Sequence, residues 1–580
     1  MDATPSSLLR LRSVDAPPNE VVNAHPRPYY YLENFTVALD WLRSRYGDLL
    51  SGEERGFIED FSVLPTESAA LIVRMVMRQG DLFRTSKLLY SEIGCPRSAA
   101  APLIESGWID PQPLLSFPNL YRLLRKAELC DALGLQETAK AVRKAELVPL
   151  IGAVATESRP LREWWPQAPD EIFHVRVASL CERLRLMFFG NFHQTWSEFV
   201  LADLGIFRYE SVCIDEAARA FQTRPQIEQF HAIYRCRELL HAEAPLEEVL
   251  CTVPAAPASP GAGWIEAKRA KLLFAIGQLY EKAHQFDRAL EIYRPCGHPQ
   301  ARIRGIRVLE RLERHEEAAA LLATVQQHPA SELETQLATR IARRLARKLT
   351  PAAGTPTLRK RAARHGWDNL ELELPQPQSA SAEGAQRVEL AVTAHLGTPR
   401  APVLYVENTL LNAIFGLLCW EAIFTPLPGA FFHAFHAAPA DLLEPEFHTR
   451  RAPQFAACFA QLTDGRYRQT ILDTFERKTG IQTPFVAWNW LTREQLELAL
   501  DCIPATHLYE LLQRLLTDVR ANRSGLPDLI QLWPAERRYR LIEVKGPGDR
   551  LQDNQIRWLN FCVAREIPVC VCKVKWMDLS

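Results

Sequence analysis

The segment from 525 to 575 constrains the fold more than any other part of this chain. Apolar stretches at 526–532, 539–544 and 569–575 predict three strands, and the amphipathic stretch 551–565 predicts a helix between the last two. A short turn separates the first two strands, so these should pair antiparallel. An α/β domain is therefore expected at the C-terminal end.

Three charged residues lie on this strand pair. Asp528 opens the first strand, and Glu543 and Lys545 lie near the end of the second. Residues two apart on a strand point to one face, so Glu543 and Lys545 should lie together, with Asp528 beside Glu543 on the neighbouring strand. Two carboxylates this close repel, and one takes up a proton unless a cation lies between them. Oxygen ligands favour Mg²⁺ or Mn²⁺, and Lys545 could hold an attacking water or stabilise charge on a phosphate. The pattern predicts a metal-dependent nuclease.

The alternative is that Glu-x-Lys on a strand is only a solvated ion pair, which is common. Here a Pro-Asp pair precedes Glu543 with its aspartate fifteen residues earlier, apolar strands flank both motifs, and Gly546-Pro547 ends the second strand. The combined pattern is much rarer than Glu-x-Lys alone and favours the nuclease interpretation.

Length and composition bound the rest of the chain. With 580 residues, about three or four domains are expected. The net charge of −1 means that binding to a polyanion would need local basic surfaces. The thirteen cysteines form no CxxC pair, so no zinc finger or disulfide framework is expected. No stretch resembles a signal peptide or a membrane span, which predicts a cytoplasmic protein, associated with the nucleoid in a bacterium.

Periodicity and composition predict helical N-terminal and middle regions ahead of the α/β domain. Apolar residues at helical spacing predict helices at 39–50, 69–77 and 83–93, and the proline-containing stretch 96–118 is typical of short turns or a small winged unit. The expected segments are a disordered N-terminus (1–28), an α-rich DNA-binding domain (29–116), a helix–loop–helix module (117–160), a helical domain (161–374), a linker (375–385) and the α/β domain (386–580).

The stretch 120–151 reads as two short helices around a loop, each carrying Lys-Ala-Glu-Leu. It resembles a SAP module, which binds the DNA backbone; an ordinary helical hairpin is the alternative. Its basic residues are the expected phosphate contacts, and two basic residues of the earlier segment 80–93 are further candidates for contact with the DNA backbone. They are Arg84, Lys87, Arg122, Arg125, Lys126, Lys140, Arg143 and Lys144.

The middle region carries a repeat-like spacing of small and large residues. Gly277, Tyr280, Phe286, Ala289 and Tyr293 match a tetratricopeptide repeat, and a looser copy follows at 309–319. After it, nine basic residues and no acid occupy 340–364, which is either a solvated helix face with a linker or a surface that tracks phosphates. The nine are Arg340, Arg343, Arg344, Arg347, Lys348, Arg359, Lys360, Arg361 and Arg364.

Several motifs together resemble a known family. GLPDLI (525–530), LIEVKGPGDRL (541–551), and Gln555 with Trp558 resemble the virus-type replication-repair nuclease (VRR-NUC) domain of the PD-(D/E)xK superfamily, and YVENTLLNAIFGLLCWEAIF (405–424) resembles the helix that opens it. With YYYLENF (29–35) and GDLFRTSKLLYSEI (80–93), the chain from about residue 29 onward resembles the bacterial type of the Fanconi-associated nuclease family.

This resemblance implies a restriction-endonuclease-like fold and a concrete activity. The family cuts branched DNA near a junction, preferring a 5′ flap or a 5′ end, in the repair of interstrand crosslinks. It implies that Glu407, Asp528 and Glu543, with the backbone carbonyl of Val544, bind two Mn²⁺ or Mg²⁺ ions. Lys545 would assist the attacking water, leaving a 3′-hydroxyl. Gln555 would orient the site from the next helix.

The chain also departs from the family's eukaryotic members. It has no residues for their ubiquitin-binding zinc finger, and Asn554 stands where their 5′-phosphate pocket has a basic residue, which puts strict 5′-phosphate dependence in doubt. One rival hypothesis is a non-catalytic DNA-binding adaptor that uses the helical repeats. Another is a Holliday-junction-type resolvase, which would be a symmetric dimer, whereas this long asymmetric chain is expected to be a monomer.

Two groups of residues are expected to be structural. His433, His436 and His448 lie in an aromatic stretch, where packing or surface positions are expected rather than metal ligation. Trp164 and Trp165 are expected in the core or a turn.

Overall fold

The computed structural model describes residues 28–135, 144, 158–196, 208–257, 262–349, 366–375 and 388–577. The chain divides into two compact units. The first takes in residues up to Trp41, Glu53–Glu182 and Trp196–Val200, and the second takes in Leu42–Gly52, Arg183–Thr195 and the chain from Leu201 onward. The segment 1–28 expected to be disordered lies, apart from its last residue, outside the described residues.

The first unit is helical with a small antiparallel sheet. The sheet has the order β1-β5-β2, and one of its strands, β2, lies in the stretch 96–118, for which short turns or a small winged unit are expected. Helices lie in the predicted stretches 39–50 and 69–77, but 83–93 is not a helix, because Phe83 and Arg84 pair with Phe173 and Ile172 in the sheet. The elements are α1 (Tyr30–Tyr46), α2 (Gly52–Ser62), α3 (Thr66–Val76), β1 (Leu82–Arg84), α4 (Pro96–Glu105), β2 (Ile109–Asp110), β5 (Ile172–Val175) and the first turns of α8 (Ala178–Phe189).

The expected helix–loop–helix begins with α5 (Phe117–Leu123) and α6 (Lys126–Ala132). Its second half lies outside the described residues except for Lys144. A two-stranded sheet of β3 (Leu115–Ser116) and β4 (Ser158–Arg159) joins it to α7 (Leu161–Trp164). The Trp164 indole is buried and donates a hydrogen bond to the carbonyl oxygen of Leu115 (2.8 Å), so its predicted structural role is confirmed.

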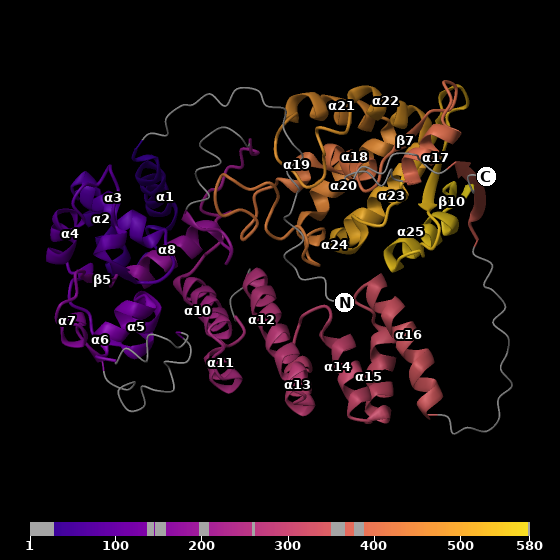
Figure 1. Cartoon of the computed structure of the whole chain (residues 1–580). Helices are drawn as coiled ribbons and strands as arrows, with labels where there is room; N and C mark the ends of the chain where they lie inside the picture. The colour runs from indigo at the N-terminus through magenta and orange to yellow at the C-terminus, as the bar shows by residue number, and fades with distance from the viewer. Residues whose placement is uncertain are drawn as a thin grey trace. The chain divides into compact units, whose positions relative to one another are not determined.

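The second unit begins with a row of helices in which each packs on the next (Figure 1). Gly277 shows why small residues occur at the crossings: a Cβ there would lie 2.5 Å from the ring of Tyr293. The spacing that predicted paired helices is therefore confirmed. The helices are α10 (Arg224–His241), α11 (Leu246–Thr252), α12 (Gly263–Lys282), α13 (Phe286–Tyr293), α14 (Ala301–Arg311), α15 (His315–Gln327) and α16 (Glu332–Leu349).

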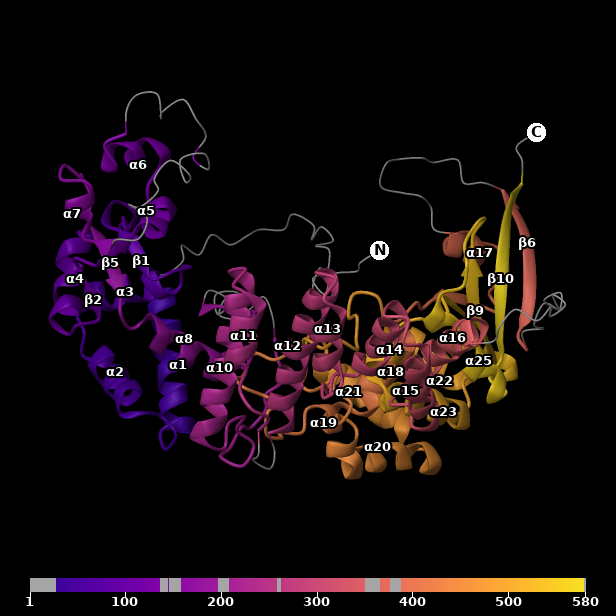
Figure 2. The same cartoon turned by 90° about the horizontal axis from the view of Figure 1, so that it is seen from below.

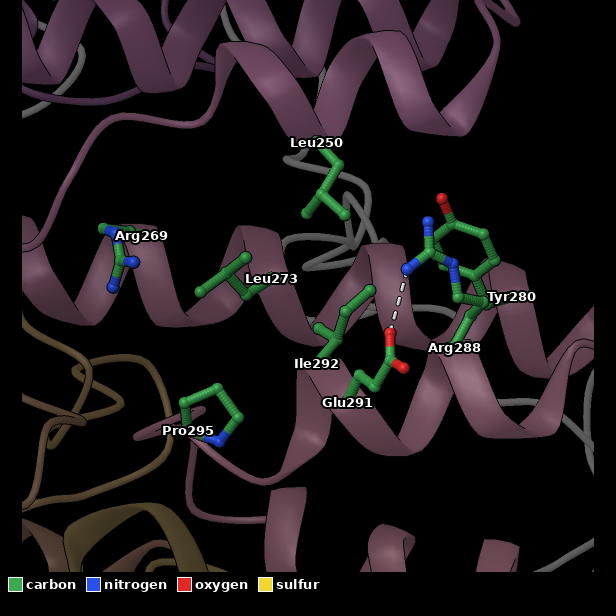
Figure 3. A pocket seen from close by; sticks show the side chains of 8 residues that line it. All are labelled: Leu250, Arg269, Leu273, Tyr280, Arg288, Glu291, Ile292 and Pro295. Atoms are coloured by element: carbon green, nitrogen blue, oxygen red, sulfur yellow. Dashed lines mark hydrogen bonds and ion pairs between the residues drawn. The ribbon is translucent and has the colours of Figure 1, made fainter.

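Buried glutamates join helices of this row. Glu281 lies 2.6 Å from Arg304, and Glu310 lies 2.5 Å from Arg344. Tyr280 lines a largely apolar hollow between α11, α12 and α13, where Arg288 and Glu291 form an ion pair (Figure 3). Arg304 and Arg344 are thus paired within the protein. The Glu281–Arg304 pair connects α12 with α14, and the Glu310–Arg344 pair connects α14 with α16.

The C-terminal part of the second unit is built on a five-stranded sheet of order β6-β10-β9-β8-β7, with β10, β9 and β6 side by side in Figure 2. β8 is antiparallel to β9 and β7, and β10 is parallel to β9 and β6. The three predicted strands are confirmed. The strands are β6 (Asp368–Pro375), β7 (Val403–Tyr405), β8 (Leu529–Trp533), β9 (Arg538–Lys545) and β10 (Val569–Met577).

Strand β6 shifts one expected boundary. Residues 368–374 were assigned to the helical domain, but β6 pairs with β10 from Asp368 to Pro375 and so belongs to the sheet. Its alternating sequence is too polar to predict a strand. Among the described residues, its hydrogen bonds come from the parallel strand β10, which is far away in the sequence. The other segment boundaries remain predictions.

Helices surround this sheet. Helix α25 (Asp553–Ala564) lies in the predicted stretch 551–565. The remaining helices are α17 (Val388–Leu396), α18 (Leu410–Leu418), α19 (Trp420–Ile423), α20 (Ala452–Asp464), α21 (Tyr467–Lys478), α22 (Arg493–Cys502), α23 (Ala505–Thr517) and α24 (Val519–Asn522). Within the described ranges, no helix has both the length and the apolarity to cross a membrane.

The irregular loop between α19 and α20 is held by a buried ion pair. Arg451, which is fully buried, donates to both carboxylate oxygens of Asp441 (2.9 and 3.0 Å). His433 is buried and stacks on Phe188, and burial lowers the pKa of His436 to about 4. His433 and His436 therefore serve packing, one of the two alternatives expected for these histidines, and the expectation for His448 stays a prediction.

Candidate active site

The β8–β9 hairpin places the predicted acids side by side. Leu529 pairs with Ile542 in the antiparallel register, so Asp528, just before β8, lies opposite Glu543 on β9. The backbone N–H of Val544 donates to Asp528 Oδ2 (2.8 Å), which fixes that carboxylate against the strand. The structure thus brings Asp528, Glu543 and Lys545 together as the spacing predicted.

Burial dominates the electrostatics of Asp528. Its side chain is only 6% exposed. Burial raises its pKa to about 6, against the lowering effects of the Val544 N–H and the charge of Lys545. The charges of Glu407 and Glu389 raise its pKa further.

The pKa of Glu543 is raised further than that of Asp528. Its side chain is fully buried, and burial, with the nearby charge of Asp528, raises its pKa to about 8. Lys545 Nζ lies 2.6 Å from Oε1, but neither carboxylate oxygen has a hydrogen bond of good geometry among the described residues. One lysine does not compensate two buried carboxylates, so protons or a further cation must.

This donor set fits a divalent metal ion. Two buried carboxylates, one with a single backbone donor and one with none among the described residues, are hard oxygen ligands, the type that Mg²⁺ and Mn²⁺ prefer. Asp528, Glu543 and the adjoining backbone of Val544 could hold such an ion. Within the described ranges, however, no three acidic, histidine or cysteine side chains converge on one point.

Glu407 lies at the rim of this site. It is exposed, on the turn after β7, and the Tyr405 hydroxyl donates to its Oε2. Its charge raises the pKa of both Asp528 and Glu543, so it is an electrostatic neighbour of the pair. Its metal-binding role stays a prediction.

Gln555 makes a different contact in this structure from the one expected of it. Its Oε1 accepts a hydrogen bond from the backbone N–H of Gln552 (2.8 Å), which caps the start of α25. Its orienting role stays a prediction.

Sequence reasoning missed Glu389. This residue lies in the first turn of α17 and contributes to the raised pKa of Asp528. A lone glutamate after an expected linker carries no signal of its own in the sequence. Only the packing of α17 on β9 and β7 brings it near the site.

The structure argues against Arg84 as a DNA contact. Its side chain is buried, its Nε donates to Asp170 (2.7 Å), and both terminal nitrogens donate to Glu128 (2.6 and 2.8 Å). Burying the positive charge among three donor–acceptor pairs leaves no group for a phosphate. Lys144 is similarly engaged, since its Nζ donates to the carbonyl oxygen of Leu124 (2.7 Å).

The other expected phosphate contacts stay predictions. Lys87, Arg122 and Arg125 are exposed, although Arg122 lies 3.6 Å from Asp81, and Lys126 is half-buried. Lys140 and Arg143 lie outside the described residues.

Three family models match successive parts of the chain. The "FAN1, HTH domain" model covers residues 29–110, the "Fanconi anemia-associated nuclease SAP domain" model covers 114–164, and the VRR-NUC domain model covers 462–576. The helix–loop–helix and the C-terminal nuclease domain are thereby assigned to the types that their motifs predicted.

Relatives extend the similarity over nearly the whole chain. The chain is 49% identical over 554 residues to the Fanconi-associated nuclease 1 homolog of Pseudomonas aeruginosa, covering 95% of this chain and 97% of that protein. It is 25% identical to the homolog of Arabidopsis thaliana, covering 95% of this chain and 67% of that protein. A crystal structure of paFAN1 bound to 2-nucleotide 5′-flap DNA with a gap matches with a TM-score of 0.82 and 48% identity, covering 96% of this chain and all of that one.

At 49% identity and near-complete coverage of both chains, the chain belongs to the Fanconi-associated nuclease family and is a DNA nuclease.

Proposed function

We propose that this nuclease hydrolyses a phosphodiester bond in branched DNA that carries a 5′ flap, using Mg²⁺ or Mn²⁺. The observation that carries the proposal is the buried Asp528–Glu543 pair, in which both pKa values are raised and the Glu543 oxygens lack hydrogen bonds among the described residues, so that the pair is a site for positive charge. The relative paFAN1 has been crystallised with 5′-flap DNA, which supports this substrate class. We further propose a role in interstrand crosslink repair.

Each residue of the site has its own role in this proposal. Asp528 and Glu543 hold the metal, with Glu407 and the Val544 carbonyl completing the ligands of two ions. A divalent cation bound there supplies positive charge against the phosphate oxygens and acidifies nearby water. Lys545 is 15% exposed at the side-chain level, so its ammonium reaches the face where a phosphate would lie, where it orients the attacking water or stabilises charge. Attack on the 5′-ending strand leaves a 3′-hydroxyl.

The test is cleavage of an end-labelled 5′-flap duplex with Mg²⁺, with Mn²⁺ and with neither. We expect cleavage only with a metal, and loss of cleavage in Glu543→Gln and Asp528→Asn, which keep side-chain volume but remove the charge. The matched control is Glu536→Gln, an exposed glutamate on the turn of the same hairpin, which should cut like the wild type. Wild-type cleavage by Glu543→Gln would refute the proposed site.

The oligomeric state and location are also proposals. We propose a monomer on one flap, which the mass of the protein–DNA complex in solution would show, whereas a symmetric dimer would favour the resolvase hypothesis. The cytoplasmic, nucleoid-associated location stays a prediction.

A further inference from the structure

Helix α18 contains one polar residue in an otherwise apolar sequence. All nine residues of Leu410–Leu418 are buried, and Asn412, at 4% exposure, is the exception in LLNAIFGLL. Burial of an amide is unfavourable unless its donors and acceptors are paired. The hydrogen bonds of Asn412 therefore point to its role.

Asn412 bridges two loops that are far apart in the sequence. Its Nδ2 donates to the carbonyl oxygen of Asn408 (2.8 Å) and to the carbonyl oxygen of Arg523 (2.9 Å). The first carbonyl belongs to the residue after Glu407, and the second lies on the loop that leads into Asp528. The two donors of one buried amide thus join the segments that carry two of the site's acids.

Asn408 makes a second connection between the same loops. Its Oδ1 accepts a hydrogen bond from the backbone N–H of Leu526 (3.3 Å), and its backbone has φ of 50°, a conformation that asparagine tolerates better than most residues. The Val406 N–H donates to the carbonyl oxygen of Asp528 (2.8 Å), so the two strands stay paired up to this point. Beyond it, among the described residues, the two asparagines continue the connection.

We infer that Asn412 and Asn408 are positioning residues that fix the separation of Glu407 from Asp528. The inference rests on the proposed function, because that separation matters only if the two acids serve one metal-dependent site. Metal sites require their ligands within a fraction of an ångström, and groups that hold the ligands commonly contribute 10- to 100-fold to affinity or activity. Asn408 also lies against Glu407 itself, since its Nδ2 is 3.5 Å from Glu407 Oε1, and both asparagines act through the acids that they hold.

The test compares Asn412→Leu, which keeps the volume and removes both donors, with Asn408→Gly, which keeps the positive φ and removes the acceptor. Purified full-length variants are assayed for kcat and KM on the 5′-flap duplex, and Mn²⁺ binding is measured separately by the rise of Tm during titration. We expect kcat to fall about 10- to 100-fold, KM for DNA to stay within about twofold, and the Mn²⁺ concentration for half-maximal Tm shift to rise about tenfold.

Ile414→Val is the matched control, since it removes a buried methylene from the same helix without touching either loop. It should lower Tm and leave kcat and the Mn²⁺ requirement unchanged. The inference is wrong if both asparagine variants keep wild-type kcat and Mn²⁺ binding, or if Ile414→Val loses as much activity as they do. Failure of the proposed function looks different, because then Glu543→Gln cuts as well as the wild type.

Discussion

Two buried acidic clusters in this protein differ in what surrounds them. Asp170 in the first unit is 3% exposed and accepts hydrogen bonds from Arg84, Thr85 and Ser86. Burial pushes its pKa upward, but these donors outweigh burial and lower the pKa to about 2. Asp528 is nearly as buried, has one backbone donor, and has its pKa raised to about 6.

This difference in hydrogen-bond donors shows that burial alone does not identify a catalytic acid. Hydrogen-bond donors that saturate a carboxylate make it a structural group, as at Asp170, while missing donors leave a site for a cation, as at Glu543. The same criterion argues against Arg84 as a DNA contact, since each of its three guanidinium nitrogens donates a hydrogen bond within the protein.

The largest expected effect comes from Glu543→Gln. We expect loss of cleavage by about 10³-fold or more, because several kcal/mol of charge stabilisation is removed and each 1.36 kcal/mol is tenfold. The same change should raise Tm of the metal-free protein, because it removes a buried charge conflict. Single-turnover cleavage and a melting curve in EDTA measure the two effects. A lower Tm would mean that the Glu543 carboxylate stabilises the metal-free fold. The contrast with Asp170 would then be wrong.

The opposite result is expected for Asp170→Asn. Leaving Arg84, Thr85 and Ser86 without their charged acceptor should cost about 3 kcal/mol in the free energy of unfolding. Urea unfolding followed by fluorescence gives this value. Cleavage per folded molecule should be unchanged. Activity lost without loss of stability would contradict the structural role.

The two clusters should also respond to pH with opposite sign. Asp170 has a folded pKa below its ordinary value of 3.8, so its stabilisation is present above pH 3.8 and is lost as pH falls toward about 2. Asp528 and Glu543 have raised folded pKa values, so the folded state binds more protons and metal-free stability falls as pH rises from about 4 through about 6 and about 8.

Melting in EDTA at pH 5.5 and pH 8 tests this difference. We expect a loss on the order of 2 kcal/mol between the two pH values in the wild type. The loss should shrink in Glu543→Gln and should persist in Asp170→Asn. An equal pH dependence in all three proteins would contradict the assignment.

The smallest expected effect is that of removing an unpaired arginine from helix α16. The comparison here is between a cation that has an acidic partner and one that has none. Arg344 is paired with Glu310, whereas Arg347 is exposed and has no acidic partner within the described part of the chain. Arg347→Ala should change stability by less than about 0.5 kcal/mol and weaken DNA binding with a salt slope reduced by about 1. Fluorescence anisotropy at several salt concentrations measures this. An unchanged slope would mean that the basic stretch is only a solvated helix face.

Local patterns predicted much of the catalytic hairpin. The apolar stretches 526–532 and 539–544 and the short turn between them are sufficient to pair Asp528 with Glu543, because an antiparallel register depends on neighbouring residues. The small-residue spacing around Gly277 predicted a close helix crossing for the same reason. Strand β6 escaped prediction because its hydrogen bonds come from a strand about two hundred residues later.

By itself, then, the sequence determined the hairpin, the order Asp528, Glu543, Lys545, and the family. Tertiary structure decided which charges are available for function. Arg84, a predicted phosphate contact, has Asp170 and Glu128 as its partners, and the amide of Asn412 donates to the loops of Glu407 and Asp528, which no local pattern predicts. The physical reason is that spacing along a chain sets which way a side chain points, whereas its charge and hydrogen bonds depend on partners that only folding brings near.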